Sequence, residues 1–172
     1  MRKESNVDGT STPYFVSWSG GKDCCLALYR TTQKYGRPKV LVTMMTENGQ
    51  RSRSHGLSKE LLEQQAACLQ IPIRFFSASW ADYEKVYLQA VESLSAEGIK
   101  MGVFGDIKVK DDPQWTTHRE FAYKVCSSHN MSVFQPLWEE EHSIIDEFFK
   151  LGFEATIIAI NEQKINSNDI FN

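Results

Sequence analysis

Short apolar runs rich in β-forming residues alternate with amphipathic stretches along this chain, and this alternation constrains the fold more than any other feature. Strands are predicted at Tyr14–Trp18, Lys39–Met45, Ile73–Phe76, Met101–Phe104, Val133–Phe134 and Glu154–Ile160. Helices are predicted at Lys22–Lys34, Leu57–Leu69, Asp82–Glu97, Gln114–Ser128 and Ser143–Leu151. Apolar strands separated by helices are typical of a parallel sheet covered on both faces, and right-handed crossovers then give a doubly wound α/β sandwich.

Length and charge limit what such a sandwich can do. The 172 residues suffice for one domain, which we expect at 13–161, between a loose arm at 1–12 and a polar tail at 162–172. The net charge of −3 argues against a protein whose main function is to bind a nucleic-acid backbone. No apolar run approaches the ~18 residues of a membrane helix, and the polar N-terminus lacks the apolar core of a signal peptide, so a cytoplasmic protein is expected. The four cysteines indicate neither a disulfide framework nor a zinc ribbon.

Ligands of doubly wound sheets bind at the carboxyl ends of the strands, and this rule selects three loops, at 17–24, 46–55 and 105–115. In the first loop a strand leads through Ser19, Gly20 and Gly21 into a helix whose first turn holds Lys22. Glycines let the backbone approach an anion, the N–H groups of a helix start point at it, and Lys22 adds positive charge. The pattern predicts a phosphate-binding loop; the alternative is an ordinary turn capped by Ser19.

The spacing in this loop excludes two common nucleotide motifs. Val16 stands where a Walker A loop needs its first glycine, and Asp23 follows the lysine where that motif has Ser or Thr. A dinucleotide fingerprint needs three spaced glycines, whereas this loop has the adjacent pair Gly20 and Gly21.

The loop Ser19-Gly20-Gly21-Lys22-Asp23-Cys24 resembles the S-G-G-K-D-S loop of the N-type ATP pyrophosphatases, or PP-loop proteins. The segments VSWSGGKD, TMMTENGQRSRSHGL, VFGDI and PLW, in that order between Tyr14 and Asn161, are similar to the diphthine–ammonia ligase family of ATP-binding proteins. The resemblance implies an adenine-nucleotide alpha-hydrolase-like (HUP, Rossmann-like) fold that binds ATP and cleaves it between the α- and β-phosphates. The ATP-binding residues it implies are Ser17, Ser19, Gly20, Gly21, Lys22, Asp23 and Cys24, with Met44 and Met45 beside the adenine unless they are core residues.

Two departures from the family pattern concern the cysteine and the C-terminal part. Cys24 replaces the last serine of the motif with a weak hydrogen-bond donor. The helix start and Lys22 predict a favoured thiolate at Cys24, and the alternative is an inert small residue in the place of the serine. Longer family members carry a Glu-Phe-His-Thr motif that this sequence lacks, so nucleotide binding is a firmer expectation than ligase activity.

The second loop concentrates positive charge in an otherwise acidic chain. Arg51, Arg53 and His55 suit phosphates or a substrate carboxylate, and Ser54 is a candidate helix cap. The alternative is a solvated loop with a capped helix. The predicted substrate-binding residues are Glu47, Arg51, Arg53, Ser54 and His55.

In the third loop Asp106 follows the fourth predicted strand at the same sheet edge as the phosphate loop. Its carboxylate is predicted to hold Mg²⁺ or to orient an attacking group, unless it is a turn or cap residue. Lys22, Asp23 and Asp106 are therefore the predicted catalytic residues. Residues for which we expect weaker, surface or packing roles are Asp111, Asp112, Trp115, His118, His129, His142, Trp80 and Trp138.

The resemblance implies an ATP-dependent ligase. A substrate carboxylate or carbonyl oxygen would attack the α-phosphorus, pyrophosphate would leave, and ammonia or another amine would displace AMP, with Mg²⁺ sharing the charge. The acceptor would be a protein side chain, such as diphthine on an elongation factor, or a small carboxylate, and a second copy of the chain is a further candidate partner. The alternatives are a nucleotide-binding sensor without turnover and a tRNA-thiolating enzyme of the same fold.

Overall fold

The computed structural model describes residues 12–108, 113–138 and 144–158. Its elements, in chain order, are β1 (Tyr14–Ser17), α1 (Lys22–Tyr35), β2 (Val40–Met45), α2 (Lys59–Leu69), β3 (Ile73–Ser77), α3 (Tyr83–Ala96), β4 (Met101–Val103), α4 (Pro113–Ser127), β5 (Ser132–Phe134) and α5 (Ile144–Lys150). Both regions expected at the termini, the arm at 1–12 and the tail at 162–172, lie outside the described residues except for Thr12.

The five strands form one sheet in the order β3-β2-β1-β4-β5, and every pair is parallel. Phe15 in the central strand β1 is level with Val40 of β2 on one side and with Gly102 of β4 on the other. The chain moves outward from β1 to β3 and then crosses to β4 and β5. The strand order therefore reverses beside β1, and this reversal confirms the predicted doubly wound α/β sheet.

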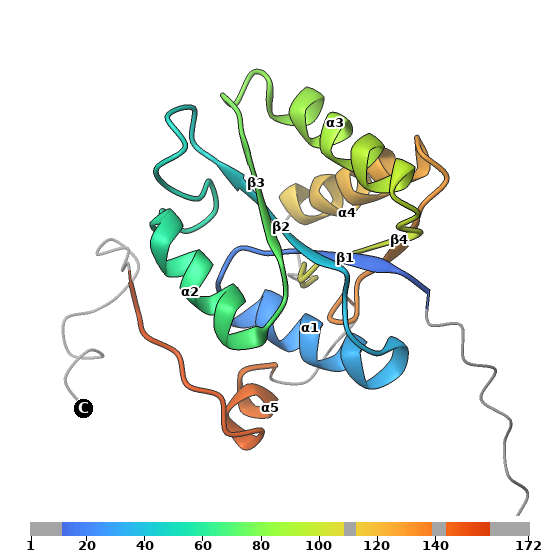
Figure 1. The fold of residues 1–172 in the computed structure, drawn as a ribbon. Coiled ribbons are helices and arrows are strands. Elements are labelled where there is room, and N and C mark those ends of the chain that lie inside the picture. The colour runs from blue at the N-terminus through green and yellow to red at the C-terminus, as the bar shows by residue number, and fades with distance from the viewer. Residues whose placement is uncertain (1–11, 109–112, 139–143, 159–172) are drawn as a thin grey trace, which may run out of the picture.

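The alternation of side chains along the strands explains the two layers of helices. Tyr14 and Val16 of β1 are buried in one core with residues of α1, α2 and α5, whereas Phe15 is buried in a second core with residues of α3 and α4. Successive strand residues point to opposite faces, so an apolar strand needs cover on both sides. Figure 1 shows α1, α2 and α5 on one side of the sheet and α3 and α4 on the other.

Two expectations about individual elements are wrong. The helix α2 begins at Lys59 rather than Leu57, and its cap is Ser58, whose hydroxyl accepts the N–H of Leu61 at 3.3 Å; Ser54 caps no helix. The strand expected at Glu154–Ile160 is absent from its described part, 154–158, where Ile157 is 79% exposed. A strand needs a hydrogen-bonding neighbour, and this segment pairs with no edge of the described sheet, so its β-forming sequence alone does not suffice.

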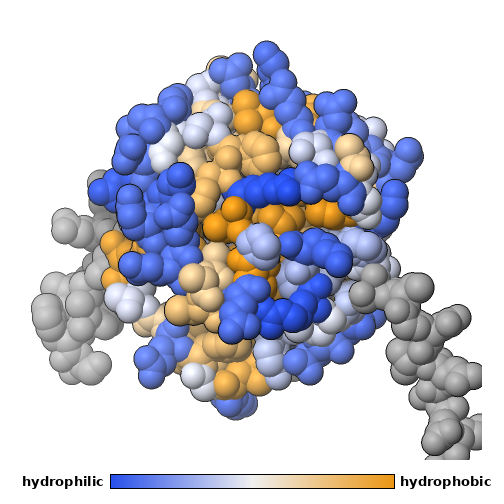
Figure 2. Space-filling view, viewed as in Figure 1, coloured by the Kyte–Doolittle hydropathy of each residue, from blue (hydrophilic) through white to orange (hydrophobic). Residues whose placement is uncertain are grey.

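The open edge of the sheet at β3 is less completely covered than its centre. Four of the five β3 residues are half-buried, whereas all six residues of β2 are buried. Figure 2, seen from the β3 side, shows apolar side chains gathered between α2 and α3 and bordered by hydrophilic ones. Among the described helices, none combines the length and the hydrophobicity that crossing a membrane requires.

Candidate functional site

The loop between β1 and α1 leaves the first N–H groups of α1 without acceptors among the described residues. Gly21 occupies the N-cap position and has no side chain to cap the helix. The first bond of the helix runs from the N–H of Cys25 to the oxygen of Gly21 at 3.2 Å, and no described residue accepts the N–H groups of Lys22, Asp23 or Cys24. These free donors at the positive end of the helix dipole form a site for an anion.

Hydrogen bonds inside the loop hold its shape. The Ser19 hydroxyl accepts the N–H of Gly21 at 3.3 Å and donates to the Cys24 sulfur, also at 3.3 Å. The Cys24 thiol in turn donates to the oxygen of Gly21 at 3.1 Å. Ser19 therefore shapes the turn. It does not cap α1, although the alternative interpretation had assigned it that role. Ser17, the half-buried last residue of β1, precedes this network.

The two glycines are required because the loop is packed closely against the segment before α2. Gly20 has a φ of +78°, and a β-carbon there would lie 2.7 Å from the Leu57 side chain. A β-carbon on Gly21 would lie 2.6 Å from Nε2 of His55. His55, predicted from its charge alone, therefore lies directly beside the phosphate loop.

Gln65 of α2 fastens the loop from the side, and sequence reasoning missed it. Its amide nitrogen donates to the oxygen of Gly20 at 3.2 Å, and its amide oxygen accepts the indole N–H of Trp18 at 3.1 Å. The only hint in the sequence was the position of Gln65, a polar residue directly before Ala66, which belongs to the apolar side of the predicted helix.

Lys22 and Asp23 stand together at the helix start. The Lys22 ammonium contacts both carboxylate oxygens of Asp23, at 2.8 and 2.9 Å, and both side chains are about one third exposed, at 37% and 32%. The lysine is thus beside the free N–H groups and remains accessible, as a phosphate ligand must be.

The predicted thiolate at Cys24 is wrong. The side chain is buried, and this burial raises the pKa of the thiol, although the Ser19 hydroxyl and nearby backbone groups oppose the rise. Desolvation outweighs the helix dipole here, and the Lys22 ammonium is engaged by Asp23. Cys24 is therefore a protonated, small residue in the place of the serine.

Asp106 follows β4 and comes close to α1 because Gly105 permits it. A β-carbon on Gly105 would lie 2.8 Å from the backbone of Cys24. The Asp106 carboxylate accepts the Gln135 amide at 3.0 Å, and Nδ1 of His118 lies 4.0 Å away. Burial raises the pKa of Asp106, and the charge of Asp23 contributes to the rise, so the two carboxylates lie within each other's field.

Two further side chains lie near Asp106. His118 is exposed, as expected of a surface residue, and approaches Asp106 from α4, whereas Gln135, which sequence reasoning missed, approaches from the end of β5. Among residues 12–108, 113–138 and 144–158, no group of three or more His, Cys, Asp or Glu side chains could hold a metal ion unaided.

Two tyrosines of α3 lie near enough to Asp106 for its charge to affect their pKa values. Burial raises the pKa of Tyr83 to about 12, with Asp106 adding to the rise and Arg53 opposing it. Tyr87 is buried against Phe104 and Phe121, and this burial raises its pKa while the nearby Ser17 hydroxyl opposes the rise. Both phenols therefore remain protonated near neutral pH.

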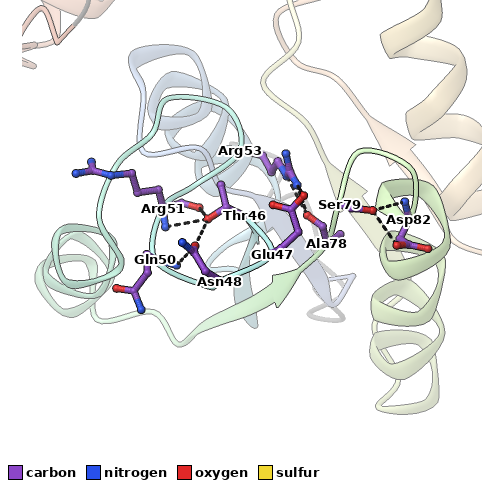
Figure 3. Close-up of polar contacts among 9 residues, drawn as sticks. All are labelled: Thr46, Glu47, Asn48, Gln50, Arg51, Arg53, Ala78, Ser79 and Asp82. Atoms are coloured by element: carbon purple, nitrogen blue, oxygen red, sulfur yellow. Dashed lines mark hydrogen bonds and ion pairs between the residues drawn. The ribbon is translucent and has the colours of Figure 1, made fainter.

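The segment after β2 holds its cations differently from the phosphate loop (Figure 3). The Arg53 guanidinium donates to the oxygen of Ala78, with Nε at 3.0 Å, and pairs with Glu47 at 2.9 Å. It also stacks over the Trp80 ring at 4.7 Å, and only 9% of its side chain is exposed. Trp80, expected as a packing residue, is instead 69% exposed.

The remaining predicted residues fall into three groups. Arg51 is exposed and donates to the oxygen of Gly56 at 2.8 Å, and Ser54 is exposed. Met44 and Met45 are buried in the two cores, on opposite faces of the sheet, and their place beside adenine stays a prediction. Among the weaker candidates, Trp138 is buried and His129 contacts Ser128, whereas Asp111, Asp112 and His142 lie outside the described residues, as does the side chain of Trp115.

Comparisons with known proteins agree with this geometry. Residues 14–132, more than half of the chain, match the family model described as diphthamide synthase N-terminal domain. A search of curated proteins found no match. The matched span includes the phosphate loop, the segment after β2 and Asp106. The chain therefore belongs to the diphthamide synthase N-terminal domain family, a PP-loop family of ATP-utilising proteins.

Proposed function

We propose that the protein is an ATP-dependent, amide-forming ligase that binds the ATP phosphates at 19–24. The observation that carries this proposal is the open start of α1, where three N–H groups without partners among the described residues stand beside the accessible Lys22. Positive partial charges and a full charge at one point suit a polyphosphate better than any neutral ligand. Residues 13–161 would then form the ATP-binding domain.

The phosphate loop would contribute to the reaction by holding the leaving group. An oxygen of the acceptor carboxylate forms a bond to the α-phosphorus while the bond from that phosphorus to the bridging oxygen breaks, and pyrophosphate departs. Lys22 and the N–H groups of α1 would lie where the leaving group gains negative charge, and would then stabilise the transition state more than the ground state. An amine then attacks the acyl carbon, and AMP leaves.

Asp23 and Asp106 suit a magnesium ion bound together with phosphates. Mg²⁺ in nucleotide sites takes one or two carboxylates and completes its shell with phosphate oxygens and water. The two carboxylates lie close enough for Asp23 to raise the pKa of Asp106, a repulsion that a cation between them would relieve. When bound, Mg²⁺ would neutralise charge on the phosphates. The Gln135 amide holds the Asp106 carboxylate, which would therefore offer the ion a fixed oxygen ligand.

The acceptor would bind over residues 46–55. His55 contributes a ring next to Gly21, and Arg51 contributes an exposed cation. Glu47 and Arg53, which are paired with each other, would support this surface, and Ser54 is exposed on it. Met44 and Met45 end the neighbouring strand, where the adenine would lie.

Isotope transfer tests this proposal. The full chain is incubated with ATP, Mg²⁺, ammonium and an acceptor labelled with ¹⁸O in its carboxylate, beginning with a diphthine-bearing elongation factor. The expected products are pyrophosphate, the amide and AMP that carries one ¹⁸O. Bound ATP without turnover would indicate a sensor, and ADP with inorganic phosphate would exclude adenylation.

A further inference from the structure

A groove of about 380 Å³ lies between the segment after β2 and the start of α3, and no residue of the phosphate loop lines it. Its volume is within the range of small-molecule sites, at the lower end. Its polar lining comes from Glu47, Ser77, Ser79, Asp82, Lys85 and Gln89. The loop chemistry proposed above leaves most of these residues unused.

Two carboxylates of the groove are held in fixed positions (Figure 3). The Glu47 carboxylate is paired with Arg53 at 2.9 Å, and this arginine is itself fixed by Ala78 and Trp80. A hydrogen bond to its own backbone and the contact with Arg53 lower the pKa of Glu47, so the group is an anion at neutral pH. Asp82 accepts the Ser79 hydroxyl at 2.8 Å, and Ser79 accepts the N–H of Asp82 at 3.0 Å.

The groove also holds a cation without a partner. Lys85 is exposed, and it pairs with no carboxylate in the part of the chain that the structure describes. It lies three residues after Asp82, on the same side of α3. The apolar part of the lining comes from Ala78 and Val86.

We propose that this groove binds a small zwitterion with an ammonium group at one end, a carboxylate at the other and a short aliphatic link. The ammonium would donate to Glu47 and Asp82, and the carboxylate would accept from Lys85. The methylene groups would lie over Ala78 and Val86. Because the two carboxylates are already oriented, binding orders few side chains, which favours affinity for a small ligand. The site goes beyond the proposed function, since it needs neither ATP nor turnover.

The experiment uses the full chain and the amino-acid series glycine, β-alanine, 4-aminobutyrate and 6-aminohexanoate, with binding measured by ligand-observed NMR. At least one member is expected to bind with a dissociation constant below about 10 mM. Its amine-only and carboxylate-only analogues are expected to bind about tenfold more weakly, because each lacks one charge-assisted contact. Absence of binding across the series, or equal binding of the analogues, would overturn the proposal.

A matched pair of variants locates the site. Lys85→Glu is expected to weaken the zwitterion about tenfold. Lys100→Glu makes the same charge change at an exposed position outside the groove and is expected to leave binding unchanged. Equal effects of the two variants would mean that net charge, not the groove, determines binding, and would overturn the proposal. ATP affinity, measured in the same samples, is expected to be unchanged in both variants, so a failure of ATP binding is distinguished from a failure of this site.

Discussion

The phosphate loop and the segment after β2 both follow an interior strand of the sheet and both carry positive charge in the sequence, yet they hold their cations in opposite ways. Lys22 is 37% exposed and touches the adjacent Asp23, whereas Arg53 is 9% exposed and is engaged by Ala78, Glu47 and Trp80. The lysine is paired with Asp23 but remains accessible to a ligand, and the arginine joins two loops of the fold. A cluster of cations in a sequence therefore does not identify a binding site until the partners of each cation are known.

The largest effect expected from this contrast is on ATP affinity. Lys22→Ala should weaken ATP binding about ten- to a hundredfold, because a charge-assisted phosphate contact contributes about 1.5–3 kcal/mol. Adenosine affinity should be unchanged. Isothermal titration of both ligands measures the difference, with Lys39→Ala, exposed directly before β2, as the control. An equal loss for ATP and adenosine would remove Lys22 from the phosphate site.

Arg53→Ala should affect stability instead. The change leaves the Ala78 oxygen, the Glu47 carboxylate and the Trp80 ring without their shared partner, which should lower the free energy of unfolding by about 2 kcal/mol. Arg51→Ala, which removes an exposed contact to Gly56, should cost much less. Urea denaturation measures both changes. If ATP affinity fell tenfold in the folded Arg53→Ala protein, the assignment of this arginine to the fold would be wrong.

A smaller effect on stability is expected at Asp106, and the direction of its pKa shift determines how that effect changes with pH. Its pKa is raised above the usual 3.8, so the folded protein binds this proton more tightly than the unfolded chain. Stability from this group is therefore lost as pH rises from about 3.8 through the raised pKa. Asp106→Asn should raise the melting temperature at pH 7 and lose that advantage near pH 3.5. It should also lower turnover while ATP still binds. A melting temperature that falls at pH 7 would contradict the burial argument.

The smallest expected effect concerns Cys24. Because burial raises the pKa of its thiol, iodoacetamide at pH 7.5 should label the exposed Cys68 first and leave Cys24 unmodified, with or without ATP. Cys24→Ser should change ATP affinity less than twofold, since the hydroxyl can keep the contact with Ser19. Peptide mass spectrometry measures the labelling. Rapid modification of Cys24 that ATP prevents would restore the thiolate interpretation.

The sequence predicted the parts of the site that depend on local pattern. A strand, two glycines and a lysine at a helix start define the phosphate loop within a few residues, and hydrophobic periodicity gave the order of the strands and helices. The sheet rule then brought Asp106 to the same edge. Each of these inferences depends on neighbours in sequence or on a general rule of parallel sheets.

Contacts between distant segments escaped prediction. Gln65 and Gln135 act through residues that lie far away along the chain, and their own surroundings in the sequence mark them weakly or not at all. The thiolate expectation failed because burial, which no local pattern reports, outweighed the helix dipole. The strand expected at Glu154–Ile160 failed for a related reason, since strand propensity does not supply a pairing partner.

The central claim is that ATP phosphates bind at the start of α1 and not over the cations after β2. Chemical shifts of the backbone amides test this claim most directly. In ¹H–¹⁵N spectra of the full chain titrated with ATP and Mg²⁺, the largest changes should occur at the amides of Lys22, Asp23 and Cys24, which have no partner among the described residues. Titration with adenosine should leave these amides nearly unmoved. If ATP instead shifted mainly the amides of residues 46–55 and left the start of α1 unchanged, the phosphate site would have been placed on the wrong loop.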